Sequence, residues 1–348
     1  MTGLVTEFIH HFQESKIYTF ASKQIMKKIT DTIHQMNKLG KEGKPFVFLI
    51  DFEMKKPLVF TLAESVGKIW FRLPGHTNIS VSKPKTSLTK WKIKPGSFEQ
   101  YKKGFNLVKH HIHNGDTYLL NYTRPTPVET DATLEDIFFL SAAKYKVLLK
   151  NEFVCFSPES FITIKNRKIY SFPMKGTIDA AIENSEKQIL EDTKEIAEHN
   201  TIVDLIRNDL SLIAENVTVD KFRYLELIKT NHKNLWQVSS QISGDLPEFY
   251  AENIGTILFS LIPAGSVSGA PKKKTLEIIR NAEQYERGYY TGIFGYYDGK
   301  NLDSCVLIRY IENLQGKLVY KSGGGITFLS EAEKEYDELI KKVYVPIA

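Results

Sequence analysis

Residues 153–172, FVCFSPESFITIKNRKIYSF, contain three short runs rich in phenylalanine, isoleucine and valine. FVCFS, FITIK and KIYSF each have the length and composition of a β-strand. Asn166 and Arg167 separate the last two runs, which predicts a hairpin between them. The stretch therefore indicates strands that follow one another directly, without a helix between them.

The segments on both sides extend this pattern. Further strand-like runs are PFVFLI, PLVFTL, TYLLNYT, GIFGYY, SCVLIRYI and KLVYKSGGGI. Helices are predicted around 22–38, over 101–112 with a stop at Gly115, over 185–207, from Pro271 onward, and from a capping box formed by Ser330 and Glu333. Strands in runs and helices in runs predict an α+β fold rather than a βαβ alternation. We expect a boundary near Gly96.

Composition limits the class of protein. The chain has 348 residues, 42% of them hydrophobic and 25% charged, which is typical of a globular protein. Its net charge of +5 is mild and its lysines are dispersed, so nucleic acid is not an expected partner. No run of 18 apolar residues occurs, so no membrane is expected either. Cys155 and Cys305 lie in apolar runs and make no disulfide framework, which favours a reducing, cytoplasmic location.

Two pairs of glutamates are candidates for a metal site. Glu195 and Glu198 lie three residues apart in one predicted helix, and Glu335 and Glu338 lie three apart in the last one. Residues at this spacing share a helix face, so each pair directs two carboxylates the same way. A solvated surface is the ordinary explanation of such a pair, and the spacing alone does not decide between it and a functional role. The alternative is a Mg²⁺ site, because Mg²⁺ takes one or two carboxylates together with water and an anionic substrate.

Other features leave two interpretations open. The glycine-rich segments 263-PAGSVSGAPK-272 and 322-SGGGI-326 can present N–H groups to an anion, but neither matches a known phosphate loop. The single lysine in PMKGT, Lys175, follows a predicted strand, with a turn expected at Gly176 and Thr177. It is either an exposed lysine or a nucleophilic amine.

Taken together and in order, these segments resemble the chorismate-utilising enzymes, and within that family the aminodeoxychorismate synthases. The resemblance covers about the last 250 residues. It is carried by GDTYLLNYT (115–123), SPESF (157–161), PMKGT (173–177), AEHNTIVDLIRNDL (197–210), PAGSVSGAPKKKTLEII (263–279), GYYTGIFGY (288–296), DSCVLIR (303–309), SGGGI (322–326) and the final helix.

The resemblance implies a fold and a set of site residues. The fold is two orthogonally packed antiparallel sheets between helices, with residues 1–96 as a short N-terminal subdomain that contributes to it and 97–348 as the catalytic domain. Glu198 and Glu338 match direct ligands of Mg²⁺, and Glu195 and Glu335 match groups that orient them or act through water. The implied substrate contacts are Thr177, Tyr290, Arg309, Gly325 and Lys342.

The resemblance also implies a role for Lys175. Anthranilate synthases have alanine at this position, whereas aminodeoxychorismate synthases have a lysine that attacks C2 of chorismate before ammonia attacks C4. Isochorismate synthases use a lysine that activates water, and that position is Leu119 here. Many relatives have a histidine where this chain has Gln237.

The function expected from this resemblance is component I of aminodeoxychorismate synthase, in the p-aminobenzoate branch of folate biosynthesis. Neither cysteine lies in a glutaminase motif, so ammonia is expected from a separate glutamine amidotransferase subunit. Two alternatives are anthranilate synthase component I and a non-catalytic regulatory protein on the same fold.

Overall fold

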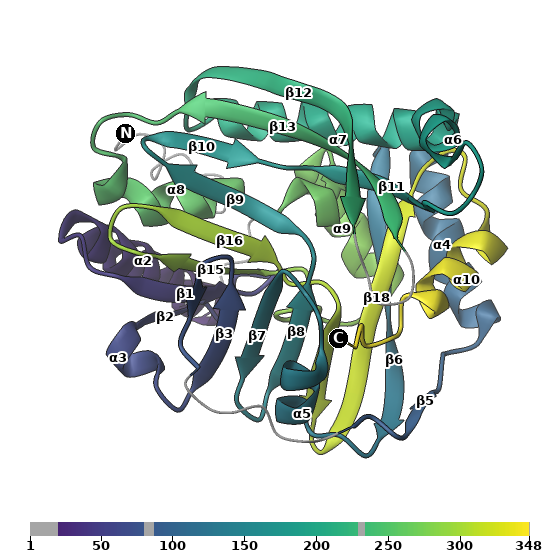
Figure 1. Cartoon of the computed structure of the whole chain (residues 1–348), viewed down its shortest axis with the longest axis horizontal. Helices are drawn as coiled ribbons and strands as arrows, with labels where there is room; N and C mark the ends of the chain where they lie inside the picture. Colours follow the sequence, from purple (N-terminus) through teal and green to yellow (C-terminus); the bar gives the residue numbers. More distant parts are fainter. Residues whose placement is uncertain (1–19, 80–86, 229–233, 348) are drawn as a thin grey trace.

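Two large antiparallel sheets form the centre of the molecule (Figure 1). The structure, a computed structural model, describes residues 20–79, 87–228 and 234–347. The first sheet contains β1 (Phe46–Ile50), β2 (Leu58–Thr61), β9 (Ser160–Lys165), β10 (Lys168–Ser171), β11 (Met174–Asp179), β12 (Glu215–Ile228), β13 (Leu235–Asp245), β15 (Ile293–Tyr297) and β16 (Leu302–Val306). The second contains β3 (Ile69–Leu73), β4 (His76–Thr77), β5 (Trp91–Ile93), β6 (Leu119–Thr130), β7 (Tyr145–Leu149), β8 (Phe153–Ser157), β14 (Gly269–Ala270), β17 (Tyr310–Leu314) and β18 (Lys317–Ile326).

Helices cover the outer faces of both sheets. They are α2 (Phe20–Lys41), α3 (Leu62–Ser65), α4 (Phe98–His113), α5 (Leu134–Leu140), α6 (Ser185–Glu191), α7 (Thr193–Ser211), α8 (Ile254–Leu261), α9 (Lys272–Glu283) and α10 (Ala332–Lys341). No helix in the described ranges combines the length and the apolar character that crossing a membrane requires.

Apolar side chains divide the core into layers. One cluster joins α2, α7 and α8 to the first sheet, and another joins α4, α9 and α10 to β6 and β18 of the second. A third lies between the sheets, where Val47 and Leu49 of β1 meet Val147 of β7 and Cys155 of β8. In Figure 1 the strands of the first sheet run across those of the second. The predicted α+β fold of two antiparallel sheets flanked by helices is confirmed.

The strand predictions around residues 153–172 are also confirmed. β9 and β10 pair antiparallel, and the two residues of the turn, Asn166 and Arg167, both adopt positive φ angles, 52° and 65°. Such angles are those of a tight hairpin turn. Residues before Gly96 supply β1 and β2 to the first sheet and β3 to β5 to the second. The boundary at residue 96 stays a prediction.

Two helix predictions are wrong. The single helix expected over 185–207 is broken at Asp192, which ends α6 and caps α7 by accepting a hydrogen bond from the Glu195 N–H. The expected capping box at Ser330 does not form, because the Ser330 hydroxyl accepts a hydrogen bond from the Thr327 N–H instead. The N-cap of α10 is Glu331, which makes no side-chain capping bond.

We predict that Gly104→Ala destabilises the fold. Gly104 is buried in α4, and a Cβ there would lie 2.0 Å from the Tyr122 hydroxyl of β6 and 2.8 Å from the Ala282 carbonyl oxygen of α9. The three elements would have to separate, at a cost of about 1–3 kcal/mol. Urea unfolding should show this loss. Gly96→Ala is the control, since its Cβ would meet only the flexible Gln100 side chain, at 3.4 Å. Equal stability of both variants would contradict the packing described here.

Candidate active site

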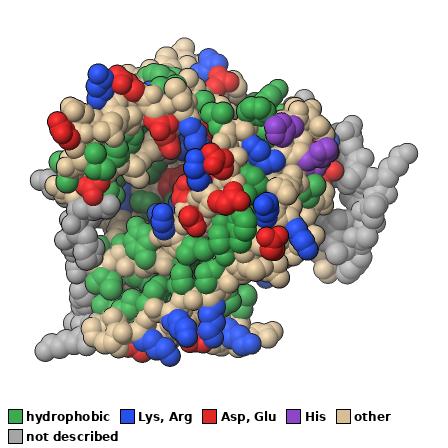
Figure 2. Space-filling view, turned by 90° about the vertical axis from the view of Figure 1, so that its right-hand side faces the viewer, with side chains coloured by type: hydrophobic (Ala, Val, Ile, Leu, Met, Phe, Trp, Pro, Cys, Tyr) green, Lys and Arg blue, Asp and Glu red, His purple; other side chains and the backbone are tan. Residues whose placement is uncertain are grey.

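A cavity of about 140 Å³ opens where the edge of the first sheet meets the glycine-rich end of β18. Its lining includes Asn121, Glu159, Lys175, Ser266, Tyr290, Arg309, Lys342 and residues 322–325. The helices α7 and α10 lie beside it, each with its pair of glutamates. Figure 2 views the molecule from this side and shows acidic and basic side chains gathered around a hollow.

The absence of side chains on β18 makes room for these groups. A Cβ on Gly325 would lie 3.3 Å from Lys175 Nζ and 3.4 Å from Glu198 Oε2. A Cβ on Gly324 would lie 3.4 Å from Glu335 Oε2 and 3.9 Å from Glu338 Oε1. These two glycines therefore form the floor over which the glutamates of both helices meet.

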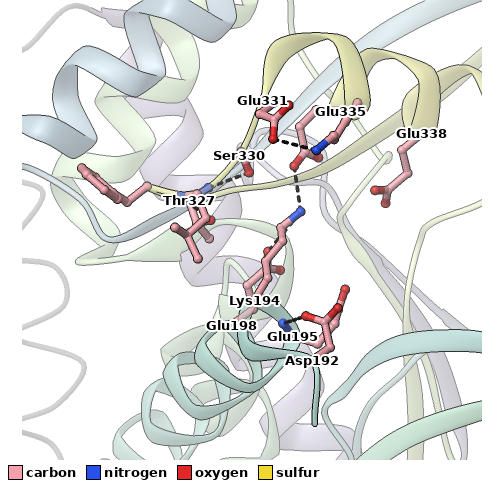
Figure 3. Close-up of polar contacts among 12 residues, drawn as sticks. Asp192, Lys194, Glu195, Glu198, Thr327, Ser330, Glu331, Glu335 and Glu338 are labelled. Atoms are coloured by element: carbon pink, nitrogen blue, oxygen red, sulfur yellow. Dashed lines mark hydrogen bonds and ion pairs between the residues drawn. The ribbon is translucent and has the colours of Figure 1, made fainter. Parts of the chain in front are cut away.

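Lysine ammonium groups lie among the glutamates. Lys175 Nζ is 3.4 Å from Glu198 Oε2, and Lys194 Nζ, which projects from the first turn of α7, is 2.9 Å from Glu335 Oε1 and 3.8 Å from Glu198 Oε1 (Figure 3). The side chains of Glu198 and Glu335 are only 7% and 4% exposed. A solvated surface, the alternative interpretation of the glutamate pairs, is therefore wrong for these two residues.

Burial and charge shift the pKa values of several groups here. Burial, aided by the charge of Glu198, raises the pKa of Glu195. Burial would also raise the pKa of Glu338, but the charge and hydrogen bond of Lys342 outweigh it and the pKa is lowered. Burial would lower the pKa of Lys194, but its hydrogen bond to Glu335 and the surrounding carboxylates raise it. The site thus keeps Lys194 charged.

The donor set fits Mg²⁺. In the part of the chain that the structure describes, no three acidic, histidine or cysteine side chains already enclose a metal position. However, all the available donors are carboxylate oxygens, which Mg²⁺ prefers, and it needs only one or two of them beside water and an anion. Gly324 and Gly325 leave the necessary space. The glutamates of α7 and α10 could therefore hold this ion.

Cationic and hydroxyl groups on the opposite wall suit a carboxylate. Arg309 and Tyr290 both line the cavity, and Arg309 has a φ of 54°, a strained angle for a residue with a side chain. One guanidinium N–H donates to the Lys342 carbonyl oxygen at 3.1 Å, which ties the arginine to the end of α10. A guanidinium held in this way can bind a carboxylate with two hydrogen bonds.

A buried ion pair supports this wall from behind. Arg287 is 1% exposed and donates to both carboxylate oxygens of Glu283, at 2.6 and 2.9 Å. It also donates to the carbonyl oxygens of Asn121 and Val267, two residues of the cavity lining. The loop before α9 and strand β6 are therefore fixed relative to each other.

The structure brings together most, but not all, of the predicted site residues. Lys175 does not lie at a turn: it is within β11, and Gly176, with a φ of 77°, forms a bulge between it and Thr177. Thr177 is exposed and is not part of the cavity lining. Gln237 pairs with Thr177 on β13 and is buried. The predicted residues that line the cavity are Lys175, Tyr290, Arg309, Gly325 and Lys342.

Sequence reasoning gave no role to two residues of the site, Glu159 and Lys194. Glu159 lines the cavity and accepts a hydrogen bond from the Ser266 hydroxyl at 2.6 Å. Burial raises its pKa, although the hydrogen bond from Ser266 and the charges of Lys175 and Lys342 act in the opposite direction, so Glu159 is a candidate for proton transfer. Its only signal in the sequence was its place in the SPESF segment.

Comparison with known proteins identifies the family. The chorismate binding enzyme family matches residues 76–348. An uncharacterized PabA-like protein of Pasteurella multocida is 49% identical over 318 residues, which are 90% of this chain and 98% of the relative. Aminodeoxychorismate synthase component 1 of Escherichia coli is 30% identical over 260 residues, 70% of this chain and 56% of that protein.

A solved structure agrees with this assignment. The crystal structure of anthranilate synthase component I from Streptococcus pneumoniae aligns with a TM-score of 0.62 and 26% identity, covering 75% of this chain and 60% of that one. This chain thus spans little more than half the length of these synthase components. Since the family matches most of the sequence and the fold agrees, this chain belongs to the chorismate-binding enzymes.

Proposed function

We propose that this protein is an aminodeoxychorismate synthase component I, which converts chorismate and ammonia to 4-amino-4-deoxychorismate in p-aminobenzoate and folate biosynthesis. The observation that carries the proposal is the position of Lys175. Its amine lies in the cavity lining, 3.4 Å from Glu198, with its side chain 20% exposed. A lysine that formed only part of the surface would not line a half-enclosed cavity together with Arg309 and Lys342.

The proposed reaction has two covalent steps. The Lys175 ammonium group first loses a proton to solvent. Its amine then forms a bond to C2 of chorismate, the two ring double bonds shift, and the bond from C4 to its hydroxyl breaks. Glu159 supplies the proton that lets this hydroxyl leave as water. Ammonia then bonds to C4, the double bonds shift back, and the bond between C2 and Lys175 breaks. Glu159 recovers a proton from the incoming ammonia, and Lys175 is released.

Charged groups hold the substrate for these steps. Chorismate carries two carboxylates, and the cavity offers two separate anion-binding regions. We assign Arg309 and the Tyr290 hydroxyl to one of them. Lys342 is assigned to the other, where its ammonium group also contacts Glu338 and the Gly323 carbonyl oxygen. Binding of both carboxylates would orient the ring so that C2 faces the Lys175 amine.

Glu198 and Glu338 are proposed to hold Mg²⁺, with Glu195 and Glu335 orienting them. When bound, the ion would neutralise a substrate carboxylate and stabilise negative charge that develops on it. The positions of Glu198, Glu335 and Glu338 around Gly324 and Gly325 support this assignment, and Glu195 lies beside Gly176 on β11.

Two observations favour this activity over those of other family members. Lys175 stands where anthranilate synthases are expected to have alanine, so a covalent route is open here. Leu119 occupies the position at which isochorismate synthases are expected to have the lysine that activates water. Its Cδ1 methyl group would lie 3.1 Å from a Cβ on Gly325, so an apolar group stands at this place. Ammonia would come from a glutamine amidotransferase partner, because both cysteines are buried in the core and cannot serve a glutaminase.

Lys175→Ala should reduce formation of aminodeoxychorismate by at least about 10³-fold, because the covalent route is lost. The variant should still bind chorismate, since the anchors for both carboxylates remain. Mass spectrometry of the product tests the loss of activity, and calorimetry with chorismate tests whether binding is retained. Lys187→Ala is the control, since this lysine is 73% exposed on α6. Anthranilate as the main wild-type product, or full activity of the alanine variant, would refute the proposal.

Glu338→Gln should lower Mg²⁺-dependent turnover by at least about 100-fold with the fold intact, because a neutral amide is a poor ligand for a divalent cation. Glu333→Gln, on the same helix and 67% exposed, should behave like the wild type. Rates measured against MgCl₂ concentration, with thermal unfolding as a check on folding, compare the two. Normal Mg²⁺ dependence in the Glu338 variant would remove this residue from the metal site.

The purified chain should use ammonium salts but not glutamine, and glutamine use should appear when an amidotransferase subunit is added. The expectation follows from the burial of both Cys155 and Cys305. Product formation with each nitrogen source, with and without the added subunit, provides the measurement. Efficient use of glutamine by the chain alone would show that it contains its own glutaminase.

A further inference from the structure

Lys194 occupies a position that local helix energetics disfavour. It is the second residue of α7, where the positive end of the helix dipole repels a cation. Its only partner within the helix, Glu198, is four residues further on, and a lysine that precedes a glutamate is the weaker orientation of such a pair. Local structure therefore does not explain why an ammonium group lies here.

The contacts of Lys194 across the site do explain it. Its ammonium group lies between α7 and α10, hydrogen-bonded to Glu335 at 2.9 Å and 3.8 Å from Glu198 (Figure 3). Both carboxylates are almost completely buried, while the lysine side chain is 35% exposed. Two buried carboxylates that face each other without a cation would repel, and neither is solvated enough to relieve the repulsion.

A divalent cation would compete with this ammonium group. Mg²⁺ binds oxygens at about 2.0–2.1 Å, so an ion on Glu198 or Glu335 would lie close to a positive charge that is already there. Leaving out Glu159, which donates a proton in the proposed reaction, four glutamates face three ammonium groups in this cluster. The carboxylates are Glu195, Glu198, Glu335 and Glu338, and the ammonium groups are Lys175, Lys194 and Lys342. With all of them ionised, a bound Mg²⁺ would turn a net negative cluster into a net positive one.

We propose that Lys194 is the built-in counter-ion of the metal-free site: it holds Glu198 and Glu335 together when no divalent cation is bound, and its charge lowers the affinity for that cation. The inference rests on the proposed magnesium site and adds a residue that sets its affinity. One consequence is that cation and substrate bind cooperatively, since an anionic substrate compensates the positive charge that the cation brings.

The experiment compares wild-type protein with Lys194→Met and Lys194→Arg. In EDTA, Lys194→Met should lower the Tm by roughly 2–4 °C, because the two buried carboxylates lose their counter-ion. Titration with MgCl₂ alone, followed by calorimetry, should give a Kd about tenfold lower than that of the wild type, and saturating MgCl₂ should remove the difference in Tm. Lys194→Arg retains the charge and should resemble the wild type in both measurements.

Lys187→Met is the matched control, because this lysine makes only an exposed helix pair with Glu191 and should change neither value. If Lys194→Met does not fold, Lys194→Gln removes the charge but retains a hydrogen-bond donor, and the same tighter binding is expected. Unchanged or weaker Mg²⁺ binding without the charge would overturn the inference and leave the proposed function standing. If the wild type shows no response to MgCl₂ even in the presence of chorismate, the magnesium site of the proposed function fails, and the inference falls with it.

Discussion

Compensation of buried negative charge is the constraint on which this site depends. Glu198 and Glu335 come from helices more than a hundred residues apart in sequence and are both almost fully buried. Burying a carboxylate is unfavourable unless a cation or hydrogen bonds accompany it. Lys175 and Lys194 supply that charge. The same requirement makes the site suitable for a metal ion together with an anionic substrate, since the positive charge of the ion and the negative charge of the substrate compensate each other.

The charged groups of the site come together at one strand, β18. β18 pairs with β6 along its length and carries the glycines beneath the carboxylates, while β11 of the other sheet delivers Lys175. The Arg287–Glu283 ion pair holds the loop before α9 against β6. Lys175 thus stands on a strand and the two glutamate pairs stand on helices, and rigid support of this kind is what orientation of a substrate requires. Glu159, Tyr290 and Arg309 lie in short connections between regular elements.

The sequence was informative where local rules govern. The β9–β10 hairpin follows from Asn166 and Arg167, and the glutamate pairs follow from helical spacing. The break at Asp192 was hidden because the helical pattern resumes directly after it, and an aspartate caps only if the chain turns there. The bridge from Lys194 to Glu335 depends on how α10 packs, which no local pattern encodes. Thr177 was expected to contact substrate, but the bulge at Gly176 leaves it exposed.

The glycine strand also limits how this protein can be made more heat-resistant. Each glycine in a strand leaves the unfolded chain with extra freedom, at a cost of roughly 0.5–1 kcal/mol relative to alanine. A Cβ on Gly323 would lie 2.5 Å from the Tyr122 carbonyl oxygen, and those on Gly324 and Gly325 would enter the site. Substitution of these β18 glycines by alanine therefore cannot be used to stabilise the protein. Stabilising substitutions have to be placed elsewhere, for instance in the surface loops or the outer helices.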